Sequence, residues 1–499
     1  MLFTSAAFLF VYLPITLAGF FAVARVGGLR MAIVWLTLCS LCFYGYWDVR
    51  FVALLLGSIA FNYLIGEALY RARASTVGKR KALLAGGIAV DLAVLGYFKY
   101  AGFFVSTVNT LTAAHLPVPQ IVLPLGISFF TFTQIAYLVD VYAGKVTERS
   151  LPRYALFVTY FPHLIAGPVL HHSEMMPQFA DEQIARLRAK NFALGLGFLV
   201  IGLAKKVLLA DSVAPLANAG FDIVNTEPLT TLQAWHATLA YSLQIYFDFS
   251  GYSDMAVGLS LLIGVRLPYN FDSPYKSRSI TEFWRRWHMT LSRFLRDYLY
   301  IPLGGNRHGA ARRHLNLLLT MLLGGLWHGA AWTFVIWGGL HGCYLMCNHG
   351  WRWCAGNIAG LRRLAGSSLA RHAGTWLGWP LTLLAVMVSW VYFRAESLPA
   401  AHRMLSCMTG ACTISGPPPG IAAQWPLLLA LAAIALFAPN SQQLIDGSLR
   451  TALDRMQGRT LLGKLEPASL LTGAAGVIVV MIAMISASRL ISEFIYFNF

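Results

Sequence analysis

Charged residues are scarce in this sequence: Asp, Glu, Lys and Arg make up 12% of the 499 residues, whereas 57% are hydrophobic. Because soluble domains usually carry about 25% charged residues, this composition excludes an ordinary soluble protein. A helix needs roughly 20 apolar residues to cross a bilayer, and such runs occupy residues 51–70, 121–142, 317–340 and 470–486. The runs do not alternate as strands of a barrel would. We therefore expect an all-α, polytopic bundle of membrane helices.

Several catalytic signatures are also missing. The sequence has no G-x-S-x-G nucleophile elbow, no H-E-x-x-H, no P-loop, and no histidine followed five positions later by aspartate. No spacing of its seven cysteines and thirteen histidines resembles a zinc site, so we expect no metal. Without a serine or cysteine nucleophile signature, a mechanism based on histidine becomes the more natural one. Cys407 and Cys412, which we place in a loop, could pair if that loop faces an oxidising compartment.

Positive charge is in excess, with a formal net charge of +17. In a membrane protein such charge marks cytoplasmic loops, so we expect no nucleic acid as partner. Lys79, Arg80 and Lys81 then lie in the cytoplasm, as do Arg362 and Arg363. This topology places the loop 395–420 and the aromatic tail 491–499 on the external face. We find no repeat and no long linker, so one domain covering 1–499 is the simplest interpretation.

A basic and aromatic segment begins at Ser279. Ser279 and Glu282 form a capping-box pattern, which predicts a helix start. On one continuous helix, Trp284 and His288 share a face with Leu291 and Leu295, and Arg285 and Arg286 lie elsewhere around it. Such a helix suits the wall of a polar cavity that holds an anionic ligand. The alternative is an amphipathic helix at the membrane interface that binds nothing.

The apolar segment 315–346 contains two histidines. An ionisable side chain at membrane depth is costly, so His328, which Trp327 precedes and Gly329 follows, is a functional candidate. The alternative is a hydrogen-bonded helix contact. His341 lies thirteen residues further on, which is about 220° around one continuous helix, so it could not share a site with His328. For His341 the structural role is favoured.

Other polar residues interrupt apolar runs. These are Asp91, Lys99, and the two aspartates of YFDFSGYSD, Asp248 and Asp254. Asp248 and Asp254 either shape a polar cavity or pair with an arginine, and pairing is the favoured role.

Three motifs carry a resemblance to a known family. The segments PYKSRSITEFWRRWH (274–288), LRDYLYIPLGGNR (295–307) and LLGGLWHGAAWTFVIWGGLHG (322–342) resemble the core of membrane-bound O-acyltransferases. Within that family the likeness is to the bacterial membrane subunits that acetylate exported polysaccharides such as alginate, and it covers nearly the whole chain. The core segment is 270–345.

The resemblance implies a fold and a set of site residues. It implies about eleven membrane helices, each of roughly 20 residues, with re-entrant or interfacial helices around a central funnel or tunnel. It implies a catalytic histidine, His328, and a second histidine, His288, facing the same tunnel. It places Trp284, Trp327, Arg285, Arg286 and Asn306 at the donor or substrate.

The resemblance also implies substrates and partners. The donor is a cytoplasmic thioester, acetyl-CoA or an acyl-carrier protein, and no bound cofactor is expected. The acceptor is a polysaccharide outside a bacterial inner membrane, reached with a periplasmic acetyltransferase of the SGNH type. The tail FIYFNF (494–499) resembles an acyl-relay motif in a related system that D-alanylates teichoic acids, with Tyr496 in the relay position. Its alternative role is an aromatic anchor at the membrane interface.

These inferences give one mechanism as a hypothesis. His328 acts as general base on the hydroxyl of Tyr496, and His288 orients the thioester or stabilises the oxyanion. Arg285 and Arg286 attract an anionic donor. A transporter or flippase, a non-catalytic scaffold, and a family member acting on peptidoglycan, cellulose or teichoic acid are the competing interpretations.

Overall fold

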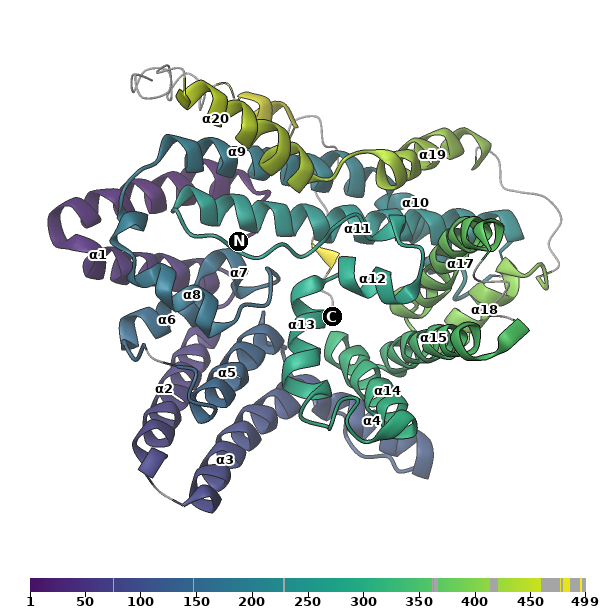
Figure 1. The fold of residues 1–499 in the computed structure, drawn as a ribbon, viewed down its shortest axis with the longest axis horizontal. Coiled ribbons are helices and arrows are strands. Elements are labelled where there is room, and N and C mark those ends of the chain that lie inside the picture. The colour runs from purple at the N-terminus through teal and green to yellow at the C-terminus, as the bar shows by residue number, and fades with distance from the viewer. Residues whose placement is uncertain are drawn as a thin grey trace. The chain divides into compact units, whose positions relative to one another are not determined.

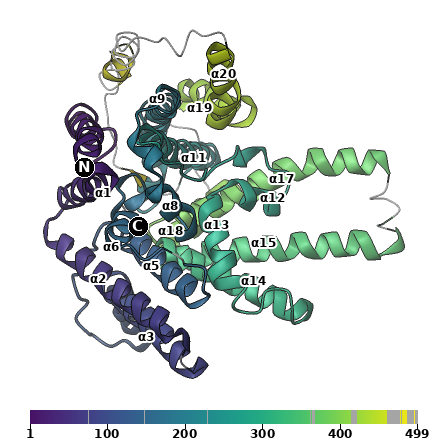
Figure 2. The same cartoon turned by 60° about the vertical axis from the view of Figure 1, so that its left-hand side comes forward.

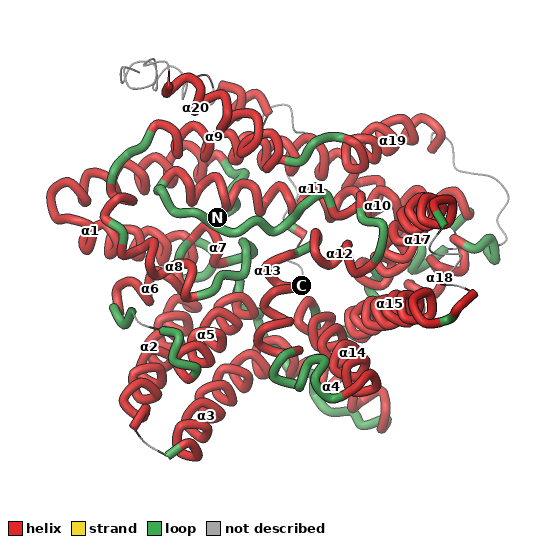
Figure 3. Tube along the Cα trace, viewed as in Figure 1, coloured by secondary structure: helices red, strands yellow, loops and turns green. Residues whose placement is uncertain are grey.

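The computed structural model describes residues 1–74, 76–146, 148–227, 229–360, 362, 367–412, 421–458, 476, 479–484 and 494–495. Throughout these ranges the secondary structure is helical and no strand occurs (Figure 3). The all-α prediction is therefore confirmed. The chain forms two compact units that interleave in sequence: the first comprises 1–203, 252–268 and 445–485, the second 204–251, 269–444 and 486–499. Whether the two units form one domain, as the sequence predicts, stays a prediction.

Five helical stretches in the described ranges are long and apolar enough to cross a membrane. They are Phe8–Gly45, Arg50–Ala74, Val77–Thr112, Ala189–Ile223 and Gly374–Arg394, and two shorter apolar helices are Ile127–Tyr142 and Ala423–Phe437. The polytopic membrane architecture is thus confirmed, whereas the number of about eleven membrane helices and the central funnel stay predictions. The expected run 470–486 lies mostly outside the described residues, and the run from 121 becomes helical only at Ile127.

The first unit opens with a long helix that bends. Gly28 has φ +73° inside α1, a conformation that glycine adopts without strain, and the helix is kinked at this residue. Two polar pairs join the helices of this unit: Asn62 donates to Asp91 at 2.7 Å in a buried bond, and Lys99 donates to Ser128 at 3.1 Å in a partly buried one. The helices of this unit are η1 Phe8–Tyr12, α1 Leu13–Gly45, α2 Arg50–Arg71, η2 Ala72–Ala74, α3 Val77–Leu95, η3 Gly96–Tyr100, α4 Ala101–Thr112, α5 Ile127–Tyr142, α6 Leu151–Thr159, α7 Phe161–Leu164, α8 His172–Ala180, η4 Glu182–Ala185, α9 Ala189–Ala204 and α20 Arg450–Gly458.

The second unit carries the segments that resemble the acyltransferase core. Its helices are η5 Lys205–Ala210, α10 Asp211–Ile223, η6 Pro274–Lys276, α12 Ile280–Arg286, α13 Met289–Leu295, η7 Arg296–Tyr300, α14 Gly309–His328, α15 Trp332–Asn357, α17 Ser368–Arg394, α18 Leu398–Met408 and α19 Ile421–Phe437 (Figure 1 labels the α-helices). The residues of α11 Thr231–Leu262 and of η8 Gln443–Leu449 are divided between the two units. Within this unit α15 and α17 run side by side as two long helices (Figure 2).

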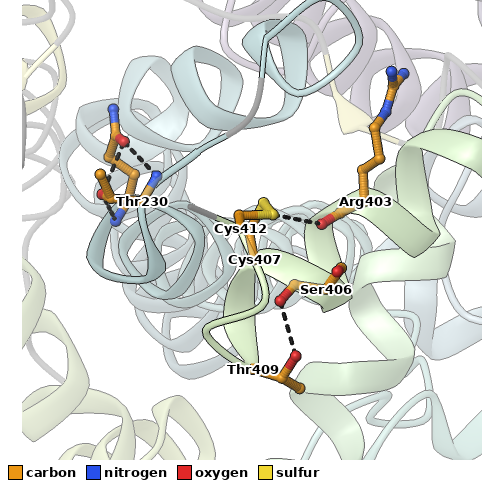
Figure 4. Close-up of a disulfide and its surroundings, with 7 residues drawn as sticks. Thr230, Arg403, Ser406, Cys407, Thr409 and Cys412 are labelled. Carbon is orange, nitrogen blue, oxygen red and sulfur yellow. Dashed lines mark hydrogen bonds between the residues drawn. A yellow bond between two sulfur atoms is a disulfide. The ribbon is translucent and has the colours of Figure 1, made fainter. Parts of the chain in front are cut away.

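A disulfide closes the end of α18. Cys407 and Cys412 are bonded, so the pairing considered from the sequence is present (Figure 4). Cys407, however, is buried within α18 and does not lie in a loop as expected, since the helix continues to Met408. The carbonyl of Met408 accepts a hydrogen bond from Trp235 Nε1 at 2.9 Å, which ties this turn to α11.

Candidate functional site

The basic helix predicted from Ser279 is broken in two at Trp287 and His288. The start is as predicted, since the Ser279 hydroxyl accepts from Glu282 N at 3.2 Å. After Arg286 the chain leaves the helix: Trp287 is extended, and His288 has φ +43° and ψ +51° before α13 begins. A non-glycine residue in this left-handed conformation persists only where its surroundings hold it. The expectation of one continuous helix with Trp284 and His288 on a shared face is therefore wrong.

Asn270 holds His288 in this conformation. Its Oδ1 accepts from Thr290 Oγ1 at 2.9 Å and from Thr290 N at 3.3 Å, and it lies 3.0 Å from His288 Nδ1. Its carbonyl accepts from Met289 N at 2.9 Å. Because a backbone N–H can only donate, the atom that Asn270 presents to Thr290 is its oxygen. His288 Nδ1 therefore carries a proton and donates, which leaves Nε2 as an acceptor.

His288 is fully buried, and burial lowers its pKa to about 3. It lies outside the helices that are long and apolar enough to span a membrane. The side chain is consequently neutral near pH 7. A neutral imidazole whose Nδ1–H is engaged by Asn270 suits the acceptance of a hydrogen bond at Nε2 rather than donation to an oxyanion.

His328 is the last residue of α14, at a second break in the chain. Gly329 is extended, with φ −158° and ψ +148°, and α15 begins only at Trp332. The His328 ring lies 4.9 Å from the Trp327 ring, 5.0 Å from Trp337 and 5.3 Å from Phe393, measured between centroids. His328 is 4% exposed. It thus lies within a cage of aromatic rings at a helix end.

The structure brings His288 and His328 together. Their ring centroids are 6.2 Å apart, and the Trp327 ring lies 6.3 Å from that of His288. The two histidines come from α13's N-terminal cap and from the C-terminal end of α14. This matches the pair of histidines that the resemblance implied.

Two glycines let α14 and α15 approach closely enough to form this cage. A Cβ added at Gly325 would lie 2.2 Å from the Phe334 carbonyl oxygen, and one added at Gly338 would lie 2.2 Å from the Met321 carbonyl oxygen. Real Cβ atoms do not approach backbone so closely, so only glycine fits at either position. The close contact brings Trp337, the neighbour of Gly338, onto His328.

The assumption that α14 and α15 form one helix was wrong, and with it the reason for separating His341 from His328. Both rings contact Trp337, His341 at 4.8 Å and His328 at 5.0 Å. The structural role favoured for His341 nevertheless fits its hydrogen bonds. Trp284 Nε1 donates to His341 Nδ1 at 3.2 Å, so Nε2 carries the proton and donates to Ser389 Oγ at 2.9 Å. Ser389 Oγ in turn donates to the Val386 carbonyl at 2.7 Å.

The other predicted site residues are dispersed. Arg285 is exposed, whereas Arg286 pairs with Glu282 at 2.9 Å. Asn306 is exposed on the loop that precedes α14, and Trp284 contacts His341 through its Nε1. Tyr496 lies outside the described residues.

The start of the C-terminal tail reaches α11. Ile495 N donates to Asp248 Oδ2 at 3.0 Å, and the Phe494 ring lies 5.8 Å from that of Phe249. Phe249 in turn contacts His288 edge-to-face, with centroids 4.8 Å apart. Asp248 pairs with Lys206 at 2.7 Å, so the expected pairing is present although the partner is a lysine rather than an arginine.

Sequence reasoning missed Asn270, Phe249 and Lys206. Lys206 could have been found, because it stands in the apolar run 189–223, where a charge calls for a partner. Asn270 and Phe249 gave no such signal, since their importance comes only from contacts made across the fold.

Comparisons with known proteins identify the family of this chain. Residues 128–359 match the membrane-bound O-acyltransferase family, MBOAT. The chain is 43% identical to "Peptidoglycan O-acetyltransferase" of Helicobacter pylori, over 83% of this chain and 81% of that protein. It is 44% identical to "Probable alginate O-acetylase AlgI" of Pseudomonas aeruginosa, over 82% of this chain and 75% of that protein. It is 29% identical to "Teichoic acid D-alanyltransferase" of Streptococcus thermophilus, over 54% of this chain and 68% of that protein.

The match covers both histidines and both chain breaks that bring them together. The relatives transfer acyl groups, according to their names, and align over most of this chain. The transporter and the non-catalytic scaffold are thereby set aside. This chain belongs to the membrane-bound O-acyltransferase family and is a membrane acyltransferase.

Proposed function

We propose that this acyltransferase moves an acetyl group from a cytoplasmic thioester to hydroxyl groups of a polysaccharide on the outer side of a bacterial inner membrane. The observation that carries the proposal is the pairing of two buried histidines, 6.2 Å apart, at the meeting of α13 and α14. The relatives named for alginate and peptidoglycan acetylation support a polysaccharide acceptor. Acetyl-CoA is the proposed donor, and an acyl-carrier protein is the alternative.

His328 is the proposed general base. It removes the proton from an attacking hydroxyl, so that the oxygen bonds to the thioester carbonyl carbon and the thiol leaves. The single proton of that hydroxyl goes to His328, so His288, neutral and with an acceptor at Nε2, is proposed to support the imidazolium that forms on His328 instead of stabilising the oxyanion. Trp327, in contact with both rings, shields the reacting groups from water.

The attacking hydroxyl is proposed to be that of Tyr496. The backbone contact of Ile495 with Asp248, and the contact of Phe249 with His288, support this choice because they lead from the tail to the site. The acyl-tyrosine then passes its acetyl group to an SGNH-type periplasmic acetyltransferase or directly to the polymer. The tail 491–499 works at the external face in this scheme.

Donor recognition is proposed to use the basic helix α12. Arg285 is exposed and lies on the same short helix as Arg286 and Trp284. Guanidinium groups bind phosphate well, which suits the phosphates of acetyl-CoA. Asn306 stays a predicted donor contact on the loop before α14.

The proposed route is tested by mass spectrometry of the purified protein incubated with acetyl-CoA. We expect an adduct of about 42 Da, one acetyl group, on the peptide that contains Tyr496. The adduct should be absent from Tyr496→Phe and from His328→Ala. Turnover on a polysaccharide without any adduct would overturn the tyrosine relay and keep the enzyme.

The acceptor is tested separately. Purified protein with its periplasmic partner is offered alginate, peptidoglycan fragments, cellulose oligomers and teichoic acid, and ester formation is measured for each. We expect acetylation of a glycan hydroxyl. Acylation of none of these glycans would contradict the proposed acceptor class.

A further inference from the structure

Three buried charged residues form a cluster in the second unit. Lys206 Nζ lies 2.7 Å from Asp211 Oδ1 and 2.7 Å from Asp248 Oδ1. The three side chains are at most 4% exposed. With all three side chains ionised, one lysine between two carboxylates gives the cluster a net charge of −1. A buried charge is tolerated only where further donors reach it.

One such donor is the backbone of the C-terminal tail. The N–H of Ile495 donates to Asp248 Oδ2, the oxygen that does not face Lys206. The bond is 3.0 Å long and buried. A bond to an ionised carboxylate is stronger than one between neutral groups, and more so when water is excluded. Because it uses the main chain, this contact fixes the path of the tail whatever side chain stands at 495.

The next residue of α11 connects this contact to the site. Phe249 packs against both Phe494 and His288, with centroid distances of 5.8 and 4.8 Å. Two consecutive residues, Asp248 and Phe249, therefore hold the tail backbone and support the second histidine. The residue that follows this contact in the sequence is Tyr496.

We propose that Asp248, held by Lys206, is a positioning residue that anchors the C-terminal tail beside His288 through the backbone N–H of Ile495. The proposal deepens the proposed function and rests on it for its catalytic consequence. Asp248 touches neither donor nor acceptor. Its effect is to raise the local concentration of the Tyr496 hydroxyl at the two histidines.

The cluster offers a matched pair of variants. Asp248→Ala removes the acceptor of the tail N–H, yet leaves Lys206 paired with Asp211, so no single charge is left buried alone. Asp211→Ala also removes one carboxylate from the cluster, but it keeps the ion pair of Lys206 with Asp248 and the hydrogen bond from Ile495 N to Asp248. A purely structural role of the cluster predicts the same effect for both variants.

The first measurement is chymotryptic cleavage after Phe494 in the full-length protein in detergent, followed by mass spectrometry of the released peptide 495–499. This site is buried in the wild type, because Phe494 is 2% and Ile495 8% exposed. Cleavage of a transiently opened segment follows the population of its open form. Loss of a hydrogen bond to a charged group should raise that population by about tenfold or more. We expect this acceleration for Asp248→Ala and no change for Asp211→Ala.

A second pair leaves the cluster intact. Ile495→Pro deletes the donor N–H, whereas Ile495→Val keeps it. Because chymotrypsin does not cleave a Phe–Pro bond but accepts proline one position earlier, this pair is compared by cleavage after Tyr496. We expect Ile495→Pro to accelerate that cleavage relative to Ile495→Val, as Asp248→Ala does relative to the wild type, and the double variant to add little to either single one, because both remove the same bond. If Asp248→Ala does not fold, this pair alone decides the question.

The catalytic consequence is measured as the rate of Tyr496 acetylation by acetyl-CoA. We expect the maximal rate to fall about tenfold in Asp248→Ala and in Ile495→Pro, with an unchanged KM for the donor. Wild-type protein cleaved as fast as Asp248→Ala, or Asp211→Ala cleaved equally fast, would overturn the anchoring. Faster cleavage in Asp248→Ala with no acetyl group on Tyr496 of the wild type would support the anchoring and overturn the relay in the proposed function.

Discussion

The rings of His288 and His328 have their centroids 6.2 Å apart, although each residue stands at a break between two helices rather than inside one. His288 precedes α13 in a left-handed conformation, and His328 ends α14. Helix ends place side chains at positions that a continuous helix cannot reach. The pair therefore depends on the two breaks as much as on the two side chains.

His328 and His341 allow a direct test of which histidine is catalytic. His328→Gln should lower acyl transfer by about a hundredfold to ten-thousandfold, the usual contribution of a general base. His341→Gln should instead lower the thermal midpoint, because it disturbs the bonds to Trp284 and Ser389. Both quantities are measured on the same detergent-purified preparations.

His341→Gln is the control: the fraction of this variant that remains folded should keep most of its acyl-transfer activity. A variant of His341 that folds normally yet loses as much activity as His328→Gln would assign His341 a catalytic role.

The parts of the fold that follow from local patterns could be predicted from the sequence. The apolar run 51–70 is the helix Arg50–Arg71, and the Ser279–Glu282 pattern does cap a helix. An apolar run, its length and a capping pattern each involve residues that are close in the sequence, so they can be recognised from the sequence alone. The two histidines were found through the family resemblance rather than through spacing.

The break between α12 and α13 could not be predicted. Neither Trp287 nor His288 is a helix breaker. The helix ends there because Asn270, which precedes α12 in the sequence, accepts hydrogen bonds from His288 and Met289. Assuming a continuous helix put Trp284 on one face with His288, which is wrong, and gave a wrong reason for separating His341 from His328. Contacts made across the fold overrode local helix preference.

The approach of α14 to α15 gives a prediction about stability. Gly325→Ala would place a Cβ 2.2 Å from the Phe334 carbonyl oxygen, which is backbone and cannot move aside. We expect a loss of about 1–3 kcal/mol of stability, seen as a lower thermal midpoint, together with lower activity because the Trp337–His328 contact shifts. Thermal unfolding in detergent provides the measurement.

Gly339→Ala is the matched control on the other helix. Its Cβ would meet Leu322 Cδ2 at 3.4 Å, an ordinary contact, and alanine favours helix over glycine. An equal loss of stability in both variants would contradict the close approach at Gly325.

The disulfide gives a prediction about the compartment that the end of α18 faces. Disulfides persist on the oxidising side of a membrane, and the distribution of Lys and Arg predicts that the loop 395–420 lies on the external side. The free cysteines are Cys39, Cys42, Cys343, Cys347 and Cys354. Protein denatured without reductant should accept five maleimide tags, and reduced protein seven. Seven tags without reduction would place this turn in a reducing compartment.

Asn270 provides a pH-dependent test of the state of His288. Asn270→Asp keeps an oxygen for His288 Nδ1 and for Thr290, but adds a negative charge, which favours the protonated imidazole. The pKa of His288 should therefore rise from its wild-type value of about 3. If His288 works as the neutral acceptor, activity is lost as the pH falls through its pKa. The acid limb of the pH–rate profile should then move to higher pH in the variant.

The comparison is made between about pH 5 and 8, where the wild-type His288 stays neutral and contributes no inflection. Thr290→Val is the control, because it removes a second donor to the same Asn270 oxygen, at 2.9 Å, without adding charge. It should lower the rate without moving the acid limb. An Asn270→Asp profile that falls equally at every pH would mean that Asn270 only shapes the chain at His288. A shifted acid limb would mean that the protonation state of His288 limits acyl transfer, and that the hydrogen bond from Nδ1 to Asn270 keeps that state neutral.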